Sequence, residues 1–135
     1  MAELQLIVVD ASIDNRAATE LKRRGRDAVA LSELGLRHEN DEDLLPKLTD
    51  RYASEGRAWM LVTGDDAMPR EHGGTLSRLG VTLATIDPRR PDDVLQDAWQ
   101  RDVVHRWAHA MQVQAPGTIR RYSPHRNATW KAPRR

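Results

Sequence analysis

Short apolar runs alternate with stretches of helical spacing along the first 90 residues, and this alternation limits the possible folds more than any other feature of the chain. The runs are aliphatic or β-branched and end in polar turns, as buried strands do. We expect four strands, at residues 4–9, 28–31, 59–63 and 81–86. Helices are expected between and after them, at residues 13–24, 41–55, 75–79 and 91–115. Strands and helices that alternate across short links predict an α/β fold with a mainly parallel sheet.

The composition fits one globular domain with a core of its own. The chain has 135 residues, of which 39% are hydrophobic and 30% charged, and this excludes a disordered chain. It has no cysteine, which excludes disulfides and thiolate metal sites. No apolar run approaches the roughly 20 residues that span a bilayer, and the N-terminus lacks the pattern of a signal peptide. We therefore expect a cytoplasmic protein without a membrane segment.

The charge is unevenly distributed along the chain. Residues 115–135 contain six of the 21 basic side chains and none of the 20 acidic ones. We expect three parts: a domain at 1–90, a helix at 91–115 that packs on it, and a basic tail at 116–135. Basic and aromatic side chains that alternate can bind single-stranded nucleic acid, although a solvated or partly disordered terminus is equally compatible with this composition. The expected nucleic-acid contacts are Arg120, Arg121, Arg126 and Lys131.

Acidic residues gather at the expected ends of two strands and at the start of one helix. Asp10 follows the first strand, and Asp65 and Asp66 follow the third; Asn40 precedes the acidic helix start at 41–43. Carboxylates raise each other's pKa when they converge, so proteins usually bring them together around a hard cation such as Mg²⁺ or Mn²⁺. Each cluster also has an ordinary alternative: a helix cap for Asp10, first-turn charges for 41–43, and a turn for the third cluster.

In this order the three clusters resemble the motifs of the PIN-like domain family. Val8-Val9-Asp10-Ala11-Ser12 is similar to the first-strand motif, and Val62-Thr63-Gly64-Asp65-Asp66 is similar to the later Thr-x-Asp motif. The segment from Leu34 to Leu45 resembles the Gly-Leu loop and acidic helix start of compact members. The resemblance covers about residues 4–90. It implies a three-layer α/β/α fold and a metal-dependent ribonuclease, best known as the toxin of toxin–antitoxin pairs, with RNA and an antitoxin protein as partners.

The resemblance also implies roles for individual residues. Asp10, Asp41 and Asp65 would bind Mg²⁺ or Mn²⁺, which would lower the pKa of a bound water and stabilise charge on the scissile phosphate. Ser12, Thr63 and Glu42 would form a second shell that orients these acids, and Asp66 would be a further catalytic acid. The family usually has one more acid after its Thr-x-Asp motif, where this chain has Ala67 and Met68. Asp87 is a possible substitute.

Other functions are compatible with parts of the sequence. A catalytically degenerate PIN-like module would bind nucleic acid or protein without cleavage. The Asp66-Ala67-Met68-Pro69 segment is similar to the phosphoacceptor region of receiver domains, although its spacing differs. His105 and His109 have the spacing of two zinc ligands on one helix face, but the Glu of the metalloprotease pattern is absent. Trp99 and Trp107 predict a packing face, which a homodimer would bury if the domain itself does not.

Overall fold

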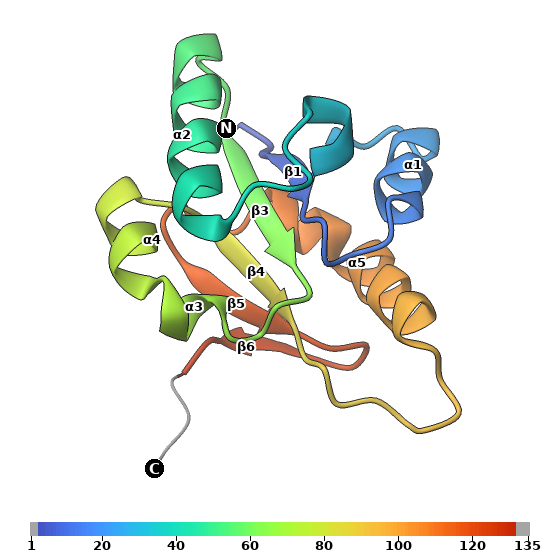
Figure 1. Ribbon diagram of the computed structural model, residues 1–135. Helices are drawn as coiled ribbons and strands as arrows, with labels where there is room; N and C mark the ends of the chain where they lie inside the picture. The colour runs from blue at the N-terminus through green and yellow to red at the C-terminus, as the bar shows by residue number, and fades with distance from the viewer. Residues whose placement is uncertain (1–2, 132–135) are drawn as a thin grey trace.

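One six-stranded sheet runs through residues 3–131, the part of the chain that this computed structural model describes, and helices cover both of its faces (Figure 1). The strands are β1 (Leu6–Val9), β2 (Ala28–Ala30), β3 (Trp59–Thr63), β4 (Leu83–Ile86), β5 (Ile119–Tyr122) and β6 (Asn127–Thr129). The helices are α1 (Arg16–Arg23), the short 3-10 helix η1 (Leu31–Leu34), α2 (Asp41–Glu55), α3 (Met68–Glu71), α4 (Gly73–Leu79) and α5 (Gln96–Gln112). The predicted α/β fold with a mainly parallel sheet is confirmed.

The strands lie in the order β2-β1-β3-β4-β5-β6. All neighbouring pairs are parallel except β5 and β6, which form an antiparallel hairpin. The carboxyl ends of β1 to β5 therefore meet at one edge of the sheet, which we call the carboxyl edge. In open α/β sheets, ligands bind outside this edge.

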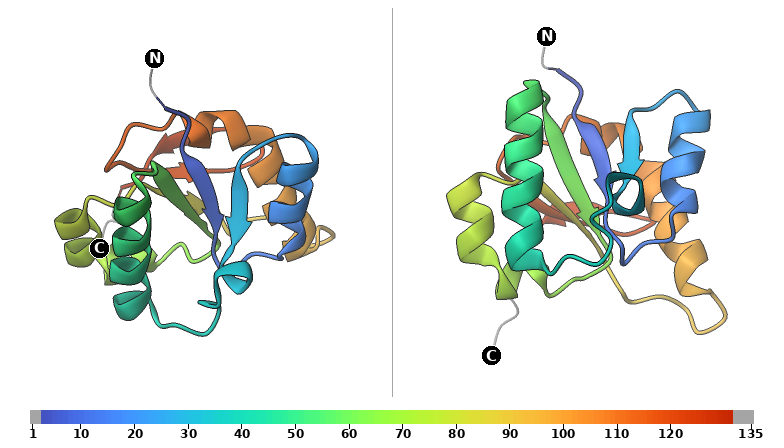
Figure 2. Two further views of the ribbon diagram at one scale, coloured as in Figure 1. Left: turned by 90° about the horizontal axis from the view of Figure 1, so that it is seen from above. Right: turned by 45° about the horizontal axis from the view of Figure 1, so that its top comes forward.

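Two apolar clusters hold the three layers together, one on each face of the sheet. Alternate side chains of a strand point to opposite faces, so Ile7 packs against α1 and α5, whereas Val8 packs against α2 and α4. Both side chains are completely buried. Figure 2 shows the same division, with α2, α3 and α4 on one side of the sheet and α1 and α5 on the other. Strands that are buried on both faces have continuous apolar sequences, and this is why they could be predicted from the sequence.

The ends of α2 follow the local sequence rules. The Asn40 side chain caps the helix by accepting a hydrogen bond of 3.0 Å from the backbone N–H of Asp43. Gly56 ends it with a φ of 62°, a conformation that glycine adopts without strain. Pro46 lies inside the helix, where it removes one backbone hydrogen bond. The buried side chains of Leu44, Leu45 and Leu48 hold the helix on the sheet.

The connection from β4 through α5 to β5 has the opposite hand to the β1–α1–β2 connection. Both helices lie on the same face of the sheet, but the two connections move in opposite directions along the strand order. Crossovers between parallel strands are almost always right-handed, so one of these two is of the rare kind. Residues 87–95, which form neither helix nor strand, carry the chain to the face covered by α1 (Figure 1).

The structure corrects the prediction of a separate basic tail at 116–135. Residues 119–122 pair with β4 as an interior strand of the sheet, and 127–129 form its edge strand. Tyr122 is only 1% exposed, and the indole N–H of Trp107 donates a 2.6 Å hydrogen bond to the carbonyl oxygen of Ser123. The boundary expected at residue 90 is also wrong, because the sheet continues to residue 129; residues 132–135 lie outside the described part.

Among residues 3–131, no helix combines the length and the apolar character needed to cross a membrane.

Candidate active site

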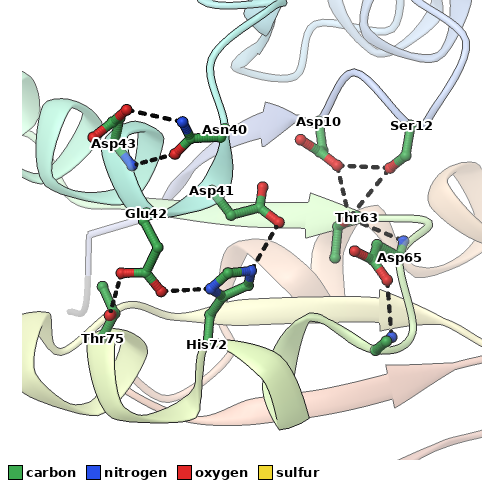
Figure 3. A network of polar contacts seen from close by, with 11 residues as sticks. Asp10, Ser12, Asn40, Asp41, Glu42, Asp43, Thr63, Asp65, His72 and Thr75 are labelled. Carbon is green, nitrogen blue, oxygen red and sulfur yellow. Dashed lines mark hydrogen bonds and ion pairs between the residues drawn. The ribbon is translucent and has the colours of Figure 1, made fainter.

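Asp10 and Asp65 are brought together by two neighbouring parallel strands. In the register of β1 and β3, Val9 lies opposite Val62, so both chains reach the carboxyl edge at the same level. The backbone N–H of Asp10 continues this pairing with a 2.9 Å hydrogen bond to the carbonyl oxygen of Val62. The Asp10 residue is 8% exposed, whereas Asp65 is half-buried. Figure 3 shows both carboxylates on the same side of this edge.

Two hydroxyl groups fix the position of the Asp10 carboxylate. The Ser12 and Thr63 hydroxyls both donate to its Oδ2 atom, at 2.6 and 2.8 Å. Each hydroxyl oxygen also accepts a backbone hydrogen bond: Ser12 from Gly64 at 2.9 Å and Thr63 from Asp65 at 3.0 Å. The hydroxyls thus connect the loop after β1 to the loop after β3 (Figure 3). These hydrogen bonds are compatible with the orienting role that the family resemblance implies for Ser12 and Thr63.

Asp41 approaches the same place from the first turn of α2. Its carboxylate points towards Asp10 and Thr63 in Figure 3. Its pKa is raised above the usual 3.8, first by burial and then by the negative charge of Asp10, with smaller effects of Asp65 and Glu71. This coupling of the carboxylates is what a set of converging acids produces. Three elements, β1, β3 and α2, therefore each contribute one acid to the carboxyl edge.

A histidine lies beside this cluster and adds positive charge to it when the ring is protonated. His72 lies in the α3–α4 region; its Nε2 atom is 3.4 Å from Asp41 Oδ2, and its Nδ1 atom is 2.6 Å from Glu42 Oε1. The hydrogen bond to Glu42, together with the charge of Asp41, raises the pKa of His72 above 6.5 despite its burial. Thr75 donates to the other oxygen of Glu42 at 3.0 Å. Glu42 therefore orients His72 rather than Asp10.

Asp66 and Asp87 are each paired with an arginine. Arg121 of β5 bonds both carboxylate oxygens of Asp66, at 2.9 and 2.6 Å. Asp87 bonds Arg89 at 2.8 and 3.1 Å, and this hydrogen bonding lowers the pKa of Asp87 below 3.8 although burial opposes it. A bidentate arginine pair uses the acceptor positions that a metal or substrate would need. The expectation that Asp66 is a catalytic acid, and the suggestion that Asp87 substitutes for one, are not supported by these contacts.

The four predicted nucleic-acid contacts separate into two pairs. Arg121 is held by Asp66, and Arg120 bonds the side-chain oxygen of Asn127 across the hairpin. The side chains of Arg126 and Lys131 are exposed and have no ion pair within residues 3–131.

The cluster has the type of ligand atom that a hard divalent cation prefers, but its side chains do not surround a single ion position. Asp10, Asp41 and Asp65 present carboxylate oxygens to one space (Figure 3), and oxygen donors suit Mg²⁺ and Mn²⁺. Within residues 3–131, however, no three His, Asp or Glu side chains are close enough to enclose an ion between them. A cation at this edge would therefore have to keep several of its water molecules and take few direct protein ligands, as Mg²⁺ usually does.

Some contributors to this region could not be recognised from the sequence. His72 could not be assigned to the acidic cluster from the sequence, because nothing in the sequence indicates that α4 packs on α2. Gln100 of α5 packs against Gly64, and a side chain at position 64 would collide with the Gln100 amide. Gly64 thus leaves room for the buried Gln100 side chain beside the loop that presents Asp65.

Comparisons with known proteins found no match to this chain among protein-family models, curated proteins or solved structures.

Proposed function

We propose that this protein is a PIN-like, metal-dependent ribonuclease that hydrolyses phosphodiester bonds at the carboxyl edge of its sheet. One observation supports the proposal above the others: Asp10 and Asp65 leave adjacent parallel strands and are joined through Thr63, while Asp41 faces them from α2. An α/β sheet supports many functions. The proposal therefore depends on these side chains and on the motifs that place them, not on the fold.

In this proposal the three acids bind Mg²⁺ or Mn²⁺, which supplies a water nucleophile near neutral pH and offsets charge on the phosphate. Ser12 and Thr63 hold the Asp10 carboxylate in one orientation through Oδ2, which leaves Oδ1 for other partners. His72 partly balances the negative charge of the site when no cation is bound. The proposed substrate is RNA. A toxin role and an antitoxin partner are further proposals that follow from the family resemblance alone. A cytoplasmic location is a proposal that rests on the composition of the sequence.

The second candidate is a catalytically degenerate PIN-like module that binds nucleic acid or protein. The arginine pairs of Asp66 and Asp87 favour it, because they occupy the acids best placed to replace the missing fourth acid. A receiver-like phosphoacceptor is the weakest candidate. Its acceptor would be Asp66, both of whose oxygens are bonded by Arg121.

The test is cleavage of a labelled single-stranded RNA with Mn²⁺ by the natural protein and by Asp10→Asn and Asp65→Asn. Asp50→Asn serves as the matched control, because Asp50 is exposed on the outer face of α2. Cleavage is expected from the natural protein and the control, and its loss is expected in both site variants. Undiminished cleavage by both variants would exclude this mechanism. RNA binding by the natural protein without cleavage would favour the degenerate module.

A further inference from the structure

A pocket of about 290 Å³ lies between the β5–β6 hairpin and the start of the loop that follows β4. We call it the hairpin pocket. Its wall includes Asp87, Arg89, Arg121, Arg126, Trp130 and Lys131. The pocket is thus built from the segment that the sequence alone suggested to be a tail. Pairing of the hairpin with β4 makes it a fixed part of the sheet.

The charge of the hairpin pocket favours an anionic ligand. Four cationic side chains and one carboxylate line it. Arg89 is bonded to Asp87, and Arg121 to Asp66. Arg126 and Lys131 have no acidic partner within residues 3–131, so their charges remain available to a ligand. Phosphate groups of nucleic acids are bound by arginine and lysine side chains of this kind.

Trp130 adds a flat apolar surface to the same wall. Its backbone N–H donates a 3.1 Å hydrogen bond to the carbonyl oxygen of Ile119, which ties residue 130 to β5. The residue is half-buried, and its indole N–H has no acceptor in the described part of the chain. An aromatic ring beside free cations is the combination that binds single-stranded nucleic acid: the ring stacks on a base, and the cations contact the backbone.

The hairpin pocket is linked to the acidic site along the carboxyl edge. Arg121 forms one wall of the pocket and bonds Asp66, the residue after Asp65. The edge passes from β3 through β4 to β5 in the strand order, and Asp87 follows β4 between the two places. The hairpin pocket meets this edge at Asp87 and Arg121, whereas Trp130 lies beside Ile119 at the other end of β5. A strand that leaves the acids along this edge would therefore enter the pocket at Arg121 and continue along the hairpin to Trp130.

We propose that the hairpin pocket binds a single-stranded RNA, with one base stacked on Trp130 and phosphates of the strand contacted by Arg126 and Lys131. The choice of RNA as the ligand rests on the proposed function. The existence of the pocket and its positive charge do not depend on that function. Stacking requires an unpaired base, so the site excludes duplex RNA. The pocket then acts as a substrate-binding subsite beside the acids, and its residues position the RNA without taking part in the chemistry.

The test measures binding of a fluorescein-labelled single-stranded RNA by anisotropy, in EDTA and on the Asp10→Asn background, so that no cleavage intervenes. Trp130→Ala is expected to weaken binding about 5- to 100-fold, the usual effect of removing one stacking platform. Trp130→Phe keeps an aromatic face and should retain most of the affinity. Arg126→Ala/Lys131→Ala should lower the slope of log affinity against log salt by about 1.4, as expected for two lost contacts to a single strand.

The matched control is Arg23→Ala/Arg24→Ala, which also removes two positive charges. These arginines lie at the C-terminal end of α1, which packs on β2, and β2 is the outer strand on the side of the sheet away from the hairpin. This variant should bind RNA as the background protein does, and a duplex of the same length should bind more weakly and be insensitive to Trp130→Ala. Unchanged binding by Trp130→Ala, or an equal loss in the control pair, overturns the subsite. A protein that binds in this way but never cleaves RNA contradicts only the proposed function.

Discussion

Thr63 Oγ1 donates a 2.8 Å hydrogen bond to Asp10 Oδ2, across the boundary between β3 and β1. The same oxygen accepts from the backbone N–H of Asp65 at 3.0 Å. One buried hydroxyl therefore connects the Asp10 carboxylate to the backbone of Asp65, and these are the two acids that the proposed site requires. Removing it tests whether the site depends on this connection.

Thr63→Val should lower the free energy of unfolding by about 1–3 kcal/mol, because it leaves a buried carboxylate short of a donor and a backbone N–H short of an acceptor. Thr85→Val is the matched control. Thr85 lies opposite Thr63 in the next strand and is equally buried, but its hydroxyl makes only a 3.5 Å contact to Arg120. Urea denaturation measures both. Equal losses in the two variants would mean that the bond to Asp10 has no special importance.

Asp41→Asn should raise, not lower, stability at neutral pH in EDTA. The pKa of Asp41 is raised in the folded protein, so the ionised carboxylate destabilises the fold. The loss develops as pH rises from the unfolded value of 3.8 through the folded pKa and is complete above the folded pKa. Thermal unfolding at neutral pH measures the gain, and added Mn²⁺ should stabilise the natural protein more than the variant.

Asp43→Asn is the control for Asp41, since both lie in the first turn of α2 and the change in charge is the same. Asp43 receives a 2.9 Å hydrogen bond from the Asn40 side chain and interacts favourably with the helix dipole. Its replacement should therefore reduce stability. A loss of stability in Asp41→Asn as well would show that the acids at this edge do not repel one another.

His72→Gln should make the protein less stable mainly at acidic pH. The pKa of His72 is raised by its hydrogen bond to Glu42, so its stabilising effect is fully present below the unfolded value of 6.5 and disappears as pH rises through the folded pKa. Unfolding curves at about pH 5.5 and about pH 9 give the difference between the two proteins. A difference that is constant with pH, or grows at high pH, would contradict the ion pair.

Deleting residues 118–135 should abolish cooperative unfolding rather than remove a dispensable tail. The deletion takes away β5 and β6, exposes the edge of β4 and removes the buried Tyr122. Circular dichroism with urea denaturation tests this. A truncated protein that unfolds cooperatively with unchanged stability would show that the hairpin is peripheral. For this reason the hairpin pocket has to be tested with point substitutions.

The sequence predicted the first four strands because each is buried on both faces and therefore reads as an apolar run. β5 was missed for a physical reason. Its sequence Ile-Arg-Arg-Tyr has two charged side chains. Charged side chains indicate a solvent-exposed segment unless their partners in the folded protein are known. Arg121 is neutralised by Asp66, and Arg120 is bonded to Asn127. These contacts depend on the opposite-handed connection through α5, which no local pattern indicates.

The residues of the candidate site that follow directly after strands were predictable, because the strands themselves were predictable. Asp10, Ser12, Thr63 and Asp65 lie within three residues of strand ends, so the sheet register alone brings them together. Asp66 is adjacent in sequence but turns towards β5, because consecutive residues in a turn point in different directions. His72 joins the site through the packing of α4 on α2, a tertiary contact that sequence spacing does not reveal.

Binding of Mn²⁺ to the metal-free protein tests the central claim most directly. Electron paramagnetic resonance of free Mn²⁺ gives the bound fraction for the natural protein, Asp10→Asn, Asp65→Asn and the control Asp50→Asn. We expect the natural protein and the control to bind equally, and each site variant to bind about tenfold more weakly or worse. Failure of the natural protein to bind Mn²⁺, or equal binding by all four proteins, would contradict a metal site formed by Asp10, Asp41 and Asp65.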